Sequence, residues 1–592
     1  MTLLLLLACA RHPAPVETPV TTPETTDAAA GISDPALRTL LTEHWNDTMR
    51  RWPTWATAVG DHRFDDRLPA TGPAATADAI AARDGFLARA LAIAPATLPA
   101  SDRLTLALFV EKLETDAATD ICRTEQWGLS ARTSPVVDLN NLADAAAIET
   151  PAHARAYVAR LRGAGPYVDG VMANLRAGIA SGRTPAIGSA RLVLEQVRTQ
   201  LALPDADWQL ATPAKVPHPD WSPADQAVLG AELTAAIGDV RRAYEGFATF
   251  LDAELLPAAR PEEKAGTLYL PDGAACYTAL IRSETSLSRT PDDVHQTGLD
   301  ALRDIHAEMV DLGNKSLGTQ DLPTLLARLR ADRTLYFEAA PDIQARAEDA
   351  LARATAAIPR FFGRLPQAPC TVVPIPDYEA PYTYIAYYNP AVPGGRGGEY
   401  RINLSRPETR ARFEMEALTW HESIPGHHLQ IAIAQELPEM PAFRKHLGTT
   451  AYVEGWALYT ERLADEMGLY TDDVDRLGML SFDAWRASRL VVDTGIHGKG
   501  WTREQAVQFM LANTALAENN IRNEVDRYVT WPGQATAYKI GQLEMWALRR
   551  DAEARLGPRF DLKAFHDVVL GQGAVTLPVL RAQVDAWIQS VP

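Results

Sequence analysis

The stretch from Trp420 to His428 reads WHESIPGHH and holds three histidines and one glutamate within nine positions. A neutral imidazole is a good zinc ligand, and a carboxylate beside a ligand can take a proton from water. In the common helical motif H-E-x-x-H, the two histidines stand at i and i+4 on one helix face. Here position i+4 is Pro425, and the next histidines, His427 and His428, stand at i+6 and i+7. The stretch therefore has the residue types of a metal site in an unusual spacing.

An unbroken helix cannot bring these histidines to one ion. Six residues of straight helix rise about 9 Å and rotate about 600°, so His427 would lie on a different face from His421. His428 would share that face but would lie about two turns away. From the nine residues alone, a shared metal thus requires a break in the helix.

Two residues between the histidines favour such a break. Pro425 has no N–H group and clashes with the carbonyl four residues back, which belongs to His421, and Gly426 accepts unusual dihedrals. We therefore expect a bulge or kink within residues 423–426 that brings the flanking histidines together. The alternative is a helix that ends at Ile424 and leaves the later histidines in a capping turn.

One predicted helix leads into the motif, and a second follows it in the chain. Residues 405–408 read SRPE, the pattern of a capping box with proline in the first turn, and this predicts a helix from about Arg406 into the motif. Residues 449–461 read TTAYVEGWALYTE and predict a second helix. Glu454 and Glu461 are seven residues apart and so share nearly the same face. Alone they are typical of surface charges, but beside a His-Glu helix an inward glutamate is a candidate ligand.

This pair of segments resembles the glutamate-type zincins, such as thimet oligopeptidase and carboxypeptidase Taq. In those enzymes the first helix supplies two histidine ligands and the general base, and a glutamate on the next long helix supplies the third ligand. The chain as a whole resembles more closely a large bacterial family, often lipoproteins, known only as a domain of unknown function and grouped with the zincin-like peptidases. The matching stretches are PTWATAVGDHRFDDRLP from Pro53, LPDGAACYTALIRSET from Leu270, HESIPGHHLQ from His421, YVEGWALYTERLADEMG from Tyr452, VVDTGIHGKGWT from Val491 and RNEVDRYVTWPGQATAYKIGQ from Arg522.

The resemblance implies a zinc site and a peptide substrate. Carried over residue by residue, it makes His421, His427 and Glu454 zinc ligands and Glu422 the general base. The unusual spacing leaves the second ligand open between His427 and His428. The implied fold is mainly α, a gluzincin-like helical metallopeptidase fold with a small antiparallel β-sheet beside the active-site cleft.

The groups that hold the oxyanion or a terminal carboxylate are expected late in the chain, because related zincins use a tyrosine or histidine from a late segment. The candidates are His497, Arg527, Tyr528 and Tyr538, together with Lys539. A tyrosine on a helix belongs to the core more often than to a catalytic site, so each is a weak candidate alone. If its segment is helical, Asp493 would fix the tautomer of His497. Glu461 would orient a ligand histidine, or else pair with Arg462 at the surface.

Composition limits the classes of partner. The chain has 592 residues, of which 47% are hydrophobic and 22% charged, which is ordinary for a globular protein. Its net charge of −18 and the lack of a basic tract exclude nucleic acid and an electrostatic membrane patch as expected partners. The sequence does not predict an oligomeric state.

The first ten residues read MTLLLLLACA, an apolar run followed by a small residue and a cysteine. We interpret residues 1–9 as the end of a lipoprotein-type signal, with Cys9 carrying the lipid that would be the only membrane contact. The missing basic start indicates an upstream start or a poor signal, and the alternative is a chance apolar terminus. Residues 10–32, rich in Pro, Thr and Ala, would form a flexible tether. The expected location is the bacterial cell envelope, periplasmic or outer-membrane.

Two lobes are predicted after the tether: an N-terminal helical lobe over residues 33–289 and a catalytic lobe over residues 290–592. Asp34 and Thr290 each have the pattern of a helix N-cap, the latter with Asp293 as its capping-box partner. The β signal is confined to residues 371–404, where TVVPIP, YTYIAYY and EYRINLS are separated by turn residues. The three widely spaced cysteines after Cys9 predict buried thiols or at most one disulfide.

The sequence thus predicts zinc-dependent hydrolysis of peptides or small amide substrates. Two alternatives remain: a non-catalytic lipoprotein that binds peptide or metal on the same scaffold, and a hydrolase of a non-peptide amide or ester. The glutamate at 422 argues against the first, because a pure metal site does not require that carboxylate. The sequence does not predict whether cleavage occurs within a peptide or at its end.

Overall fold

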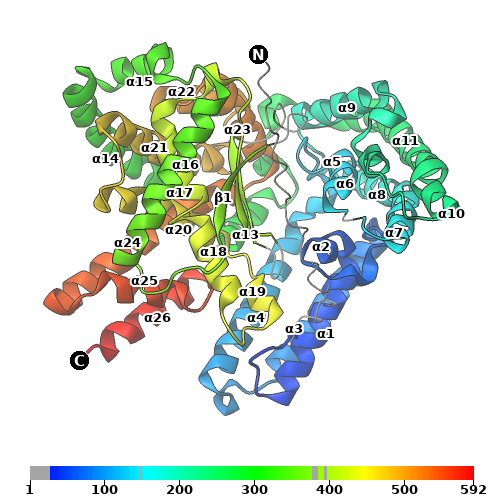
Figure 1. Cartoon of the computed structure of the whole chain (residues 1–592), viewed down its shortest axis with the longest axis horizontal. Helices are drawn as coiled ribbons and strands as arrows, with labels where there is room; N and C mark the ends of the chain where they lie inside the picture. The colour runs from blue at the N-terminus through cyan, green and yellow to red at the C-terminus, as the bar shows by residue number, and fades with distance from the viewer. Residues whose placement is uncertain (1–26, 147, 376–379, 381–384, 392–395) are drawn as a thin grey trace, which may run out of the picture.

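The computed structural model describes residues 27–146, 148–375, 380, 385–391 and 396–592, and they form a mainly helical protein with one small sheet (Figure 1). The N-terminal half contains α1 Pro35–Arg51, α2 Pro53–Ala58, α3 Pro73–Leu91, α4 Ala100–Thr119, α5 Pro135–Asn140, α6 Leu142–Ala145, α7 Pro151–Arg162, α8 Ala164–Ser181, α9 Ile187–Ala202, α10 Pro223–Ala227, α11 Leu233–Phe250, α12 Leu256–Ala258 and α13 Gly273–Thr285. Next come α14 Pro291–Leu317, α15 Leu322–Ala331, α16 Ala340–Ala357 and the strands β1 Cys370–Pro374, β2 Ala386–Asn389 and β3 Gly398–Ile402. The last third contains α17 Met415–Glu422, α18 His427–Glu436, α19 Ala442–Lys445, α20 Thr450–Glu466, α21 Asp473–Lys499, α22 Arg503–Asn513, α23 Glu518–Thr530, α24 Ala537–Leu556, α25 Leu562–Leu570 and α26 Leu577–Ser590.

Two of the predicted helix starts have the expected caps. Asp34 accepts a hydrogen bond from the backbone N–H of Leu37 at the start of α1. Thr290 and Asp293 form a reciprocal capping box at the start of α14. Such caps satisfy N–H groups that the first helical turn leaves without partners. None of the described helices combines the length and apolar content needed to span a bilayer.

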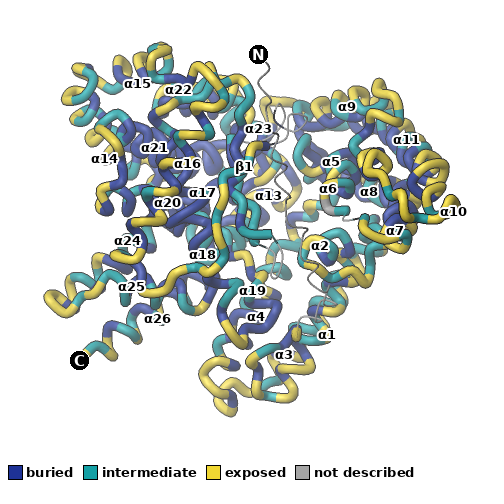
Figure 2. Tube along the Cα trace, viewed as in Figure 1, coloured by how far each residue is buried: buried dark blue, intermediate teal, exposed yellow. Residues whose placement is uncertain are grey.

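The apolar residues gather in one large core and several smaller ones. The largest core draws on helices from both predicted lobes, from Ala29 to Ile588. A second core, between Leu129 and Leu255, belongs to the group of helices around α8 and α11 at the right of Figure 1. Figure 2 shows that α17 and α20, in the larger group, are buried along most of their length. The lobe boundary at residue 290 stays a prediction.

Helix α21 runs through the interior of the large core. Every residue from Leu477 to His497 is buried, including several charged ones. These charges have partners: Asp483 pairs with Lys539 of α24, and Arg489 pairs with Glu524 of α23 at 2.9 Å. A buried charge is tolerated when it is paired and hydrogen-bonded. The helix therefore crosses the apolar core with charged side chains that pair with residues of neighbouring helices.

The sheet differs from the antiparallel one that the sequence predicted. Its strand order is β1-β3-β2, with β3 parallel to β1 and antiparallel to β2. The last strand takes the central place because its alternating residues Gly398, Tyr400 and Ile402 are buried, whereas β1 has none that is fully buried. Some of the residues in and between the predicted strands, 376–379, 381–384 and 392–395, lie outside the described residues.

The helix that carries the motif begins later than predicted. Arg406 has a left-handed backbone (φ 50°), and two short 3-10 turns, Pro407–Thr409 and Arg412–Glu414, precede α17. The Ser405 hydroxyl donates to the side chain of Asn403 at 2.6 Å instead of capping a helix. The capping-box interpretation was therefore wrong, because a local side-chain acceptor competed for the serine.

One disulfide links Cys122 to Cys276, and Cys370 is free. This agrees with the expectation of at most one bridge. The predicted signal, Cys9 and residues 10–26 of the predicted tether lie outside the described residues. In the described end of that tether, Ala29 and Ile32 are buried in the large core.

Candidate metal centre

A break in the helix brings the first two histidines of the motif together. Helix α17 ends at Glu422 and α18 begins at His427, with a turn between them. A Cβ atom on Gly426 would lie 2.0 Å from the carbonyl oxygen of His421, so only glycine fits this turn. The Ile424–Pro425 peptide bond in the turn is cis. The predicted break is present, and it closes the gap of six residues.

Glycines also set the position of α20, which carries Glu454. The Cα of Gly541 in α24 lies 2.5 Å from the position that a Cβ on Gly455 would occupy. A Cβ on Gly541 would lie 1.8 Å from the carbonyl oxygen of Ala451. The two helices therefore touch backbone to backbone, which fixes Glu454, the neighbour of Gly455, relative to α24.

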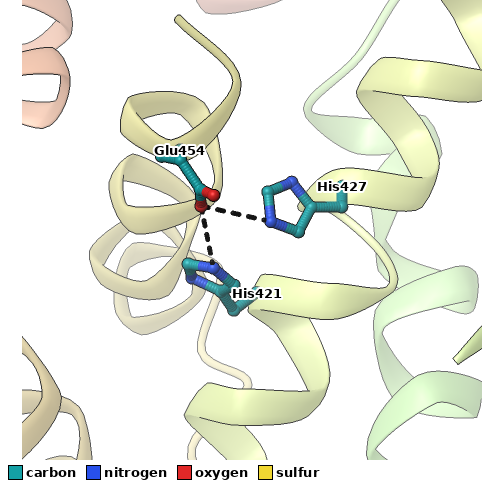
Figure 3. A group of neighbouring side chains, drawn as sticks. All are labelled: His421, His427 and Glu454. Atoms are coloured by element: carbon teal, nitrogen blue, oxygen red, sulfur yellow. Dashed lines mark ion pairs between the residues drawn. The ribbon is translucent and has the colours of Figure 1, made fainter. Parts of the chain in front are cut away.

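His421, His427 and Glu454 point toward one another from α17, α18 and α20 (Figure 3). One ligand atom from each lies within 4.8 Å of the others. The Oε2 atom of Glu454 is 3.4 Å from Nε2 of His427 and 3.7 Å from Nε2 of His421. Both separations are longer than an ordinary N–H···O hydrogen bond, which has a mode near 2.9–3.0 Å.

Glu461, two turns after Glu454, holds the other side of the first histidine. Its Oε1 atom lies 2.8 Å from Nδ1 of His421, while the Nε2 atom of that ring faces Glu454. Both groups are buried. Periodicity had placed the two glutamates on one face, and the structure confirms that both reach the same imidazole.

The field at this cluster is strongly negative. Burial disfavours the charged imidazole of His421, but the carboxylates of Glu454 and Glu461 outweigh it and raise the pKa of His421 to about 9. Burial likewise opposes ionisation of Glu454, yet its two histidine neighbours hold its pKa well below the usual range. A site that favours an imidazolium so strongly also favours another cation at the same place.

Glu422 lies at the edge of the cluster. Burial raises the pKa of its carboxyl, and the charges of His421 and His427 act against that rise. No ion pair or hydrogen bond joins its side chain to another of the residues that the structure describes. Its carboxyl therefore interacts with both imidazoles and has no hydrogen-bond or ion-pair partner within the described part of the chain.

His428 faces away from the cluster. Its Nδ1 atom lies 3.0 Å from the hydroxyl of Tyr388 on β2, and its Nε2 atom lies 3.0 Å from the carbonyl oxygen of Ala368. Burial lowers its pKa. Both ring nitrogens of His428 are thus engaged in packing α18 against the sheet.

The late candidates divide into two groups. His497 is 0% exposed, and its Nδ1 accepts from the backbone N–H of Thr267 at 3.0 Å while its Nε2 donates to the carbonyl of Tyr528 at 2.9 Å. Asp493 contacts Tyr277 and the N–H of Gly533, so it does not fix the tautomer of His497 as predicted. Lys539 is paired with Asp483 inside the core.

Tyr528, Tyr538 and Arg527 lie together. The Tyr528 hydroxyl is buried and accepts from Arg489 at 2.8 Å, and Arg527 donates to the hydroxyl of Tyr538 at 3.3 Å. Tyr538 stands one helical turn before Gly541, the residue that touches α20 beside Glu454. Tyr538 is thus on α24, which packs against α20 beside Glu454. Arg527 is hydrogen-bonded to Tyr538.

Sequence reasoning did not select Arg486, a buried arginine of α21 whose Nη2 atom lies 3.8 Å from Oε1 of Glu461. The available signal was the spacing of charges in an apolar segment, at Asp483, Arg486 and Arg489. Charges three residues apart on a helix lie on neighbouring positions of its surface, so Arg486 lies between the other two.

A family model described as a bacterial protein of unknown function, DUF885, matches residues 53–584. The chain belongs to the DUF885 family. A solved structure described as a "putative lipoprotein" from Colwellia psychrerythraea is 26% identical, with a TM-score of 0.87 over 94% of this chain and 99% of that one. A second solved structure, described as a "putative lipoprotein of unknown function" from Shewanella oneidensis, is 19% identical, with a TM-score of 0.72 over 93% of this chain and 99% of that one. No curated protein sequence matches the chain.

Proposed function

We propose that this chain is an exported, lipid-anchored zinc-dependent hydrolase with a gluzincin-like fold that cleaves peptide bonds in peptides or small amides. The observation that carries the proposal is the convergence of His421, His427 and Glu454. The carboxyl of Glu422 follows His421 in the chain and interacts with both imidazoles. Two imidazoles and a carboxylate leave one position of a tetrahedral zinc site for water or substrate, as catalytic zinc sites require.

The spacing of the donors fits zinc better than it fits direct pairing. Zinc bonds to imidazole nitrogen and carboxylate oxygen are about 2.0–2.2 Å long, so two ligands of a tetrahedral ion stand roughly 3.4 Å apart. The separations of 3.4 and 3.7 Å from Glu454 to the two imidazoles are close to this value. His428 is not proposed as a ligand because both of its ring nitrogens have other partners.

Bound zinc would supply Lewis acidity, which lowers the pKa of water and polarises a carbonyl. The residues of the chain would do the rest. Glu422 would take a proton from the attacking water and deliver it to the leaving amine. Glu461 would hold the Nδ1 proton of His421, so that Nε2 presents its lone pair to the cluster. Tyr538, with Arg527 bonded to its hydroxyl, would donate to the oxyanion, since a phenol donates without carrying charge.

The remaining late candidates receive smaller roles. Tyr528 would support the Arg489 side chain through its hydroxyl. We assign His497 to packing, because its two nitrogens are hydrogen-bonded to backbone.

Three observations support export. The solved relatives are described as putative lipoproteins, and the apolar run before Cys9 has the form of a lipoprotein signal. The Cys122–Cys276 disulfide adds to this, because disulfides persist mainly in oxidising compartments.

The test combines chelation with a substitution at Glu422. Wild-type protein incubated with a peptide mixture should consume peptides over time, and a chelator should stop it. Glu422→Gln should lower the rate by about 10²–10⁴-fold, the usual contribution of a general base, while bound zinc stays near the wild-type level. Full activity in Glu422→Gln would eliminate the base assignment. Peptide retention without cleavage would favour the binding lipoprotein, and neither loss nor retention would favour a non-peptide amide or ester substrate.

A further inference from the structure

Behind the proposed zinc ligands stands a second pair of buried charges, Glu461 of α20 and Arg486 of α21. The Oε1 atom of Glu461 lies 2.8 Å from Nδ1 of His421 and 3.8 Å from Nη2 of Arg486. The side chains of Glu461 and Arg486 are 1% and 4% exposed. One carboxylate oxygen therefore stands between the imidazole and the guanidinium.

Two aromatic rings hold the guanidinium of Arg486 in place. Its Cζ atom lies 4.1 Å from the ring centre of Trp485 and 4.5 Å from that of Phe482. Among the described residues, Glu461 is its only ion-pair partner, and its Nε and Nη1 atoms have no hydrogen-bond acceptor. A buried arginine with so few partners is costly to stability, which indicates that its charge serves a neighbour.

Arg489, one turn further along α21, shows the contrast. It is also buried and also stacks on Trp485, at 4.4 Å, yet its Nε donates to Tyr528 and its Nη2 to Glu524. Arg489 thus has two hydrogen-bond acceptors in a network of its own, and only its Nη1 atom lacks one. Arg486 instead directs its charge at the carboxylate that holds His421.

We infer that Arg486 is a positioning residue of the metal centre: it compensates the buried charge of Glu461 and so keeps that carboxylate as the acceptor that fixes the ring of His421. The inference rests on the proposed function. Groups that orient a ligand histidine typically change metal affinity 10- to 100-fold when they are removed. Because Arg486 acts one step further back, we expect an effect near the lower end of that range.

The test is a double-mutant cycle read by zinc affinity, measured by competition with a chromophoric chelator. Arg486→Met should weaken zinc binding about 10-fold, and Arg486→Lys, which keeps the charge, should weaken it only about 3-fold. In the Glu461→Gln background, Arg486→Met should change the affinity by less than about 2-fold, because the residue through which it acts is gone. Arg462→Met is the matched control, since Arg462 follows Glu461 on α20 but forms its ion pairs with Asp483 and Glu308 instead of with Glu461.

Equal losses in the wild-type and Glu461→Gln backgrounds, or the same loss in Arg462→Met, would overturn the inference. If Arg486→Met does not fold, as circular dichroism would show, the cycle is closed with Arg486→Lys and must show the same coupling to Glu461. A wild-type protein that binds no zinc would remove the proposed function as well. A wild-type zinc site that Arg486→Met leaves unchanged would overturn this inference alone.

Discussion

His421 and His497 are both buried histidines on core helices, and each has acidic residues in its surroundings. Asp493 stands four residues before His497, and Glu454 and Glu461 of α20 face His421. At His497 both ring nitrogens are hydrogen-bonded to backbone groups, at 3.0 and 2.9 Å. At His421 one nitrogen is held by Glu461, while the other faces Glu454 at 3.7 Å beside His427. At His497 the protein's own backbone groups therefore occupy both ring nitrogens. At His421 the side chains instead converge on a point where one cation would be bound by three ligand atoms at once.

The electrostatics of the two regions differ in the same way. Burial lowers the pKa of His497 to about 3, with no carboxylate to oppose it. At His421, burial acts in the same direction, but two carboxylates reverse it and raise the pKa to about 9. Burial alone therefore does not distinguish a structural histidine from a candidate ligand. The number of carboxylates that face the imidazole does.

The largest effect is expected from the adjacent pair His427 and His428. His427→Ala should weaken zinc binding by more than about 100-fold, since loss of a ligand costs more than loss of an outer group. His428→Ala should leave zinc binding within about 3-fold and lower the free energy of unfolding instead, because it removes the contacts with Tyr388 and Ala368. Zinc titration and urea unfolding of both variants check this. The reverse pattern would make His428 the ligand.

A smaller effect is expected at His497, and only on stability. His497→Ala leaves the N–H of Thr267 and the carbonyl of Tyr528 buried without partners, so the free energy of unfolding should fall by about 3 kcal/mol. Zinc affinity should not change. His62→Ala is the control, since His62 is half exposed and pairs only with Asp65, and it should change stability by less than about 0.5 kcal/mol. A loss of zinc from His497→Ala at unchanged stability would place that histidine in the site after all.

The pH dependence of stability gives the smallest difference. His497 has a folded-state pKa of about 3 against 6.5 for a free histidine, so below pH 6.5 the unfolded chain binds a proton that the folded chain does not. Its contribution to stability is complete above pH 6.5 and is lost as the pH falls toward 3. Between pH 5.5 and 4, wild-type stability should fall by up to about 1.4 kcal/mol per pH unit more steeply than that of His497→Gln. Parallel slopes in urea unfolding would show that His497 is not buried in its neutral form.

The sequence allowed the local part of this comparison to be predicted. Pro425 and Gly426 favour a break between the histidines, and the break is present. Glycine is needed at 426 because a Cβ there would collide with the His421 carbonyl. The seven-residue spacing of Glu454 and Glu461 placed both on one face of α20, where both reach His421. These features depend on helix geometry and on neighbours in the chain.

The parts that the sequence left open or did not contain depend on contacts between distant residues. The choice between His427 and His428 follows from irregular dihedrals in the turn, such as φ −109° and ψ −115° at Ser423, which no periodic pattern contains. The order of the strands depends on which one is buried at the centre, and Arg486 becomes visible only when α21 packs against Glu461. His497 and Asp493 looked catalytic because their partners, Thr267, Gly533 and Tyr277, are far away in sequence or on other elements.

The most direct test of the central claim is anomalous scattering at the zinc absorption edge from crystals of the wild-type protein grown with zinc. The account predicts one strong peak about 2.0–2.2 Å from Nε2 of His421, Nε2 of His427 and Oε2 of Glu454. Crystals with zinc bound elsewhere and no peak between these three atoms would contradict it.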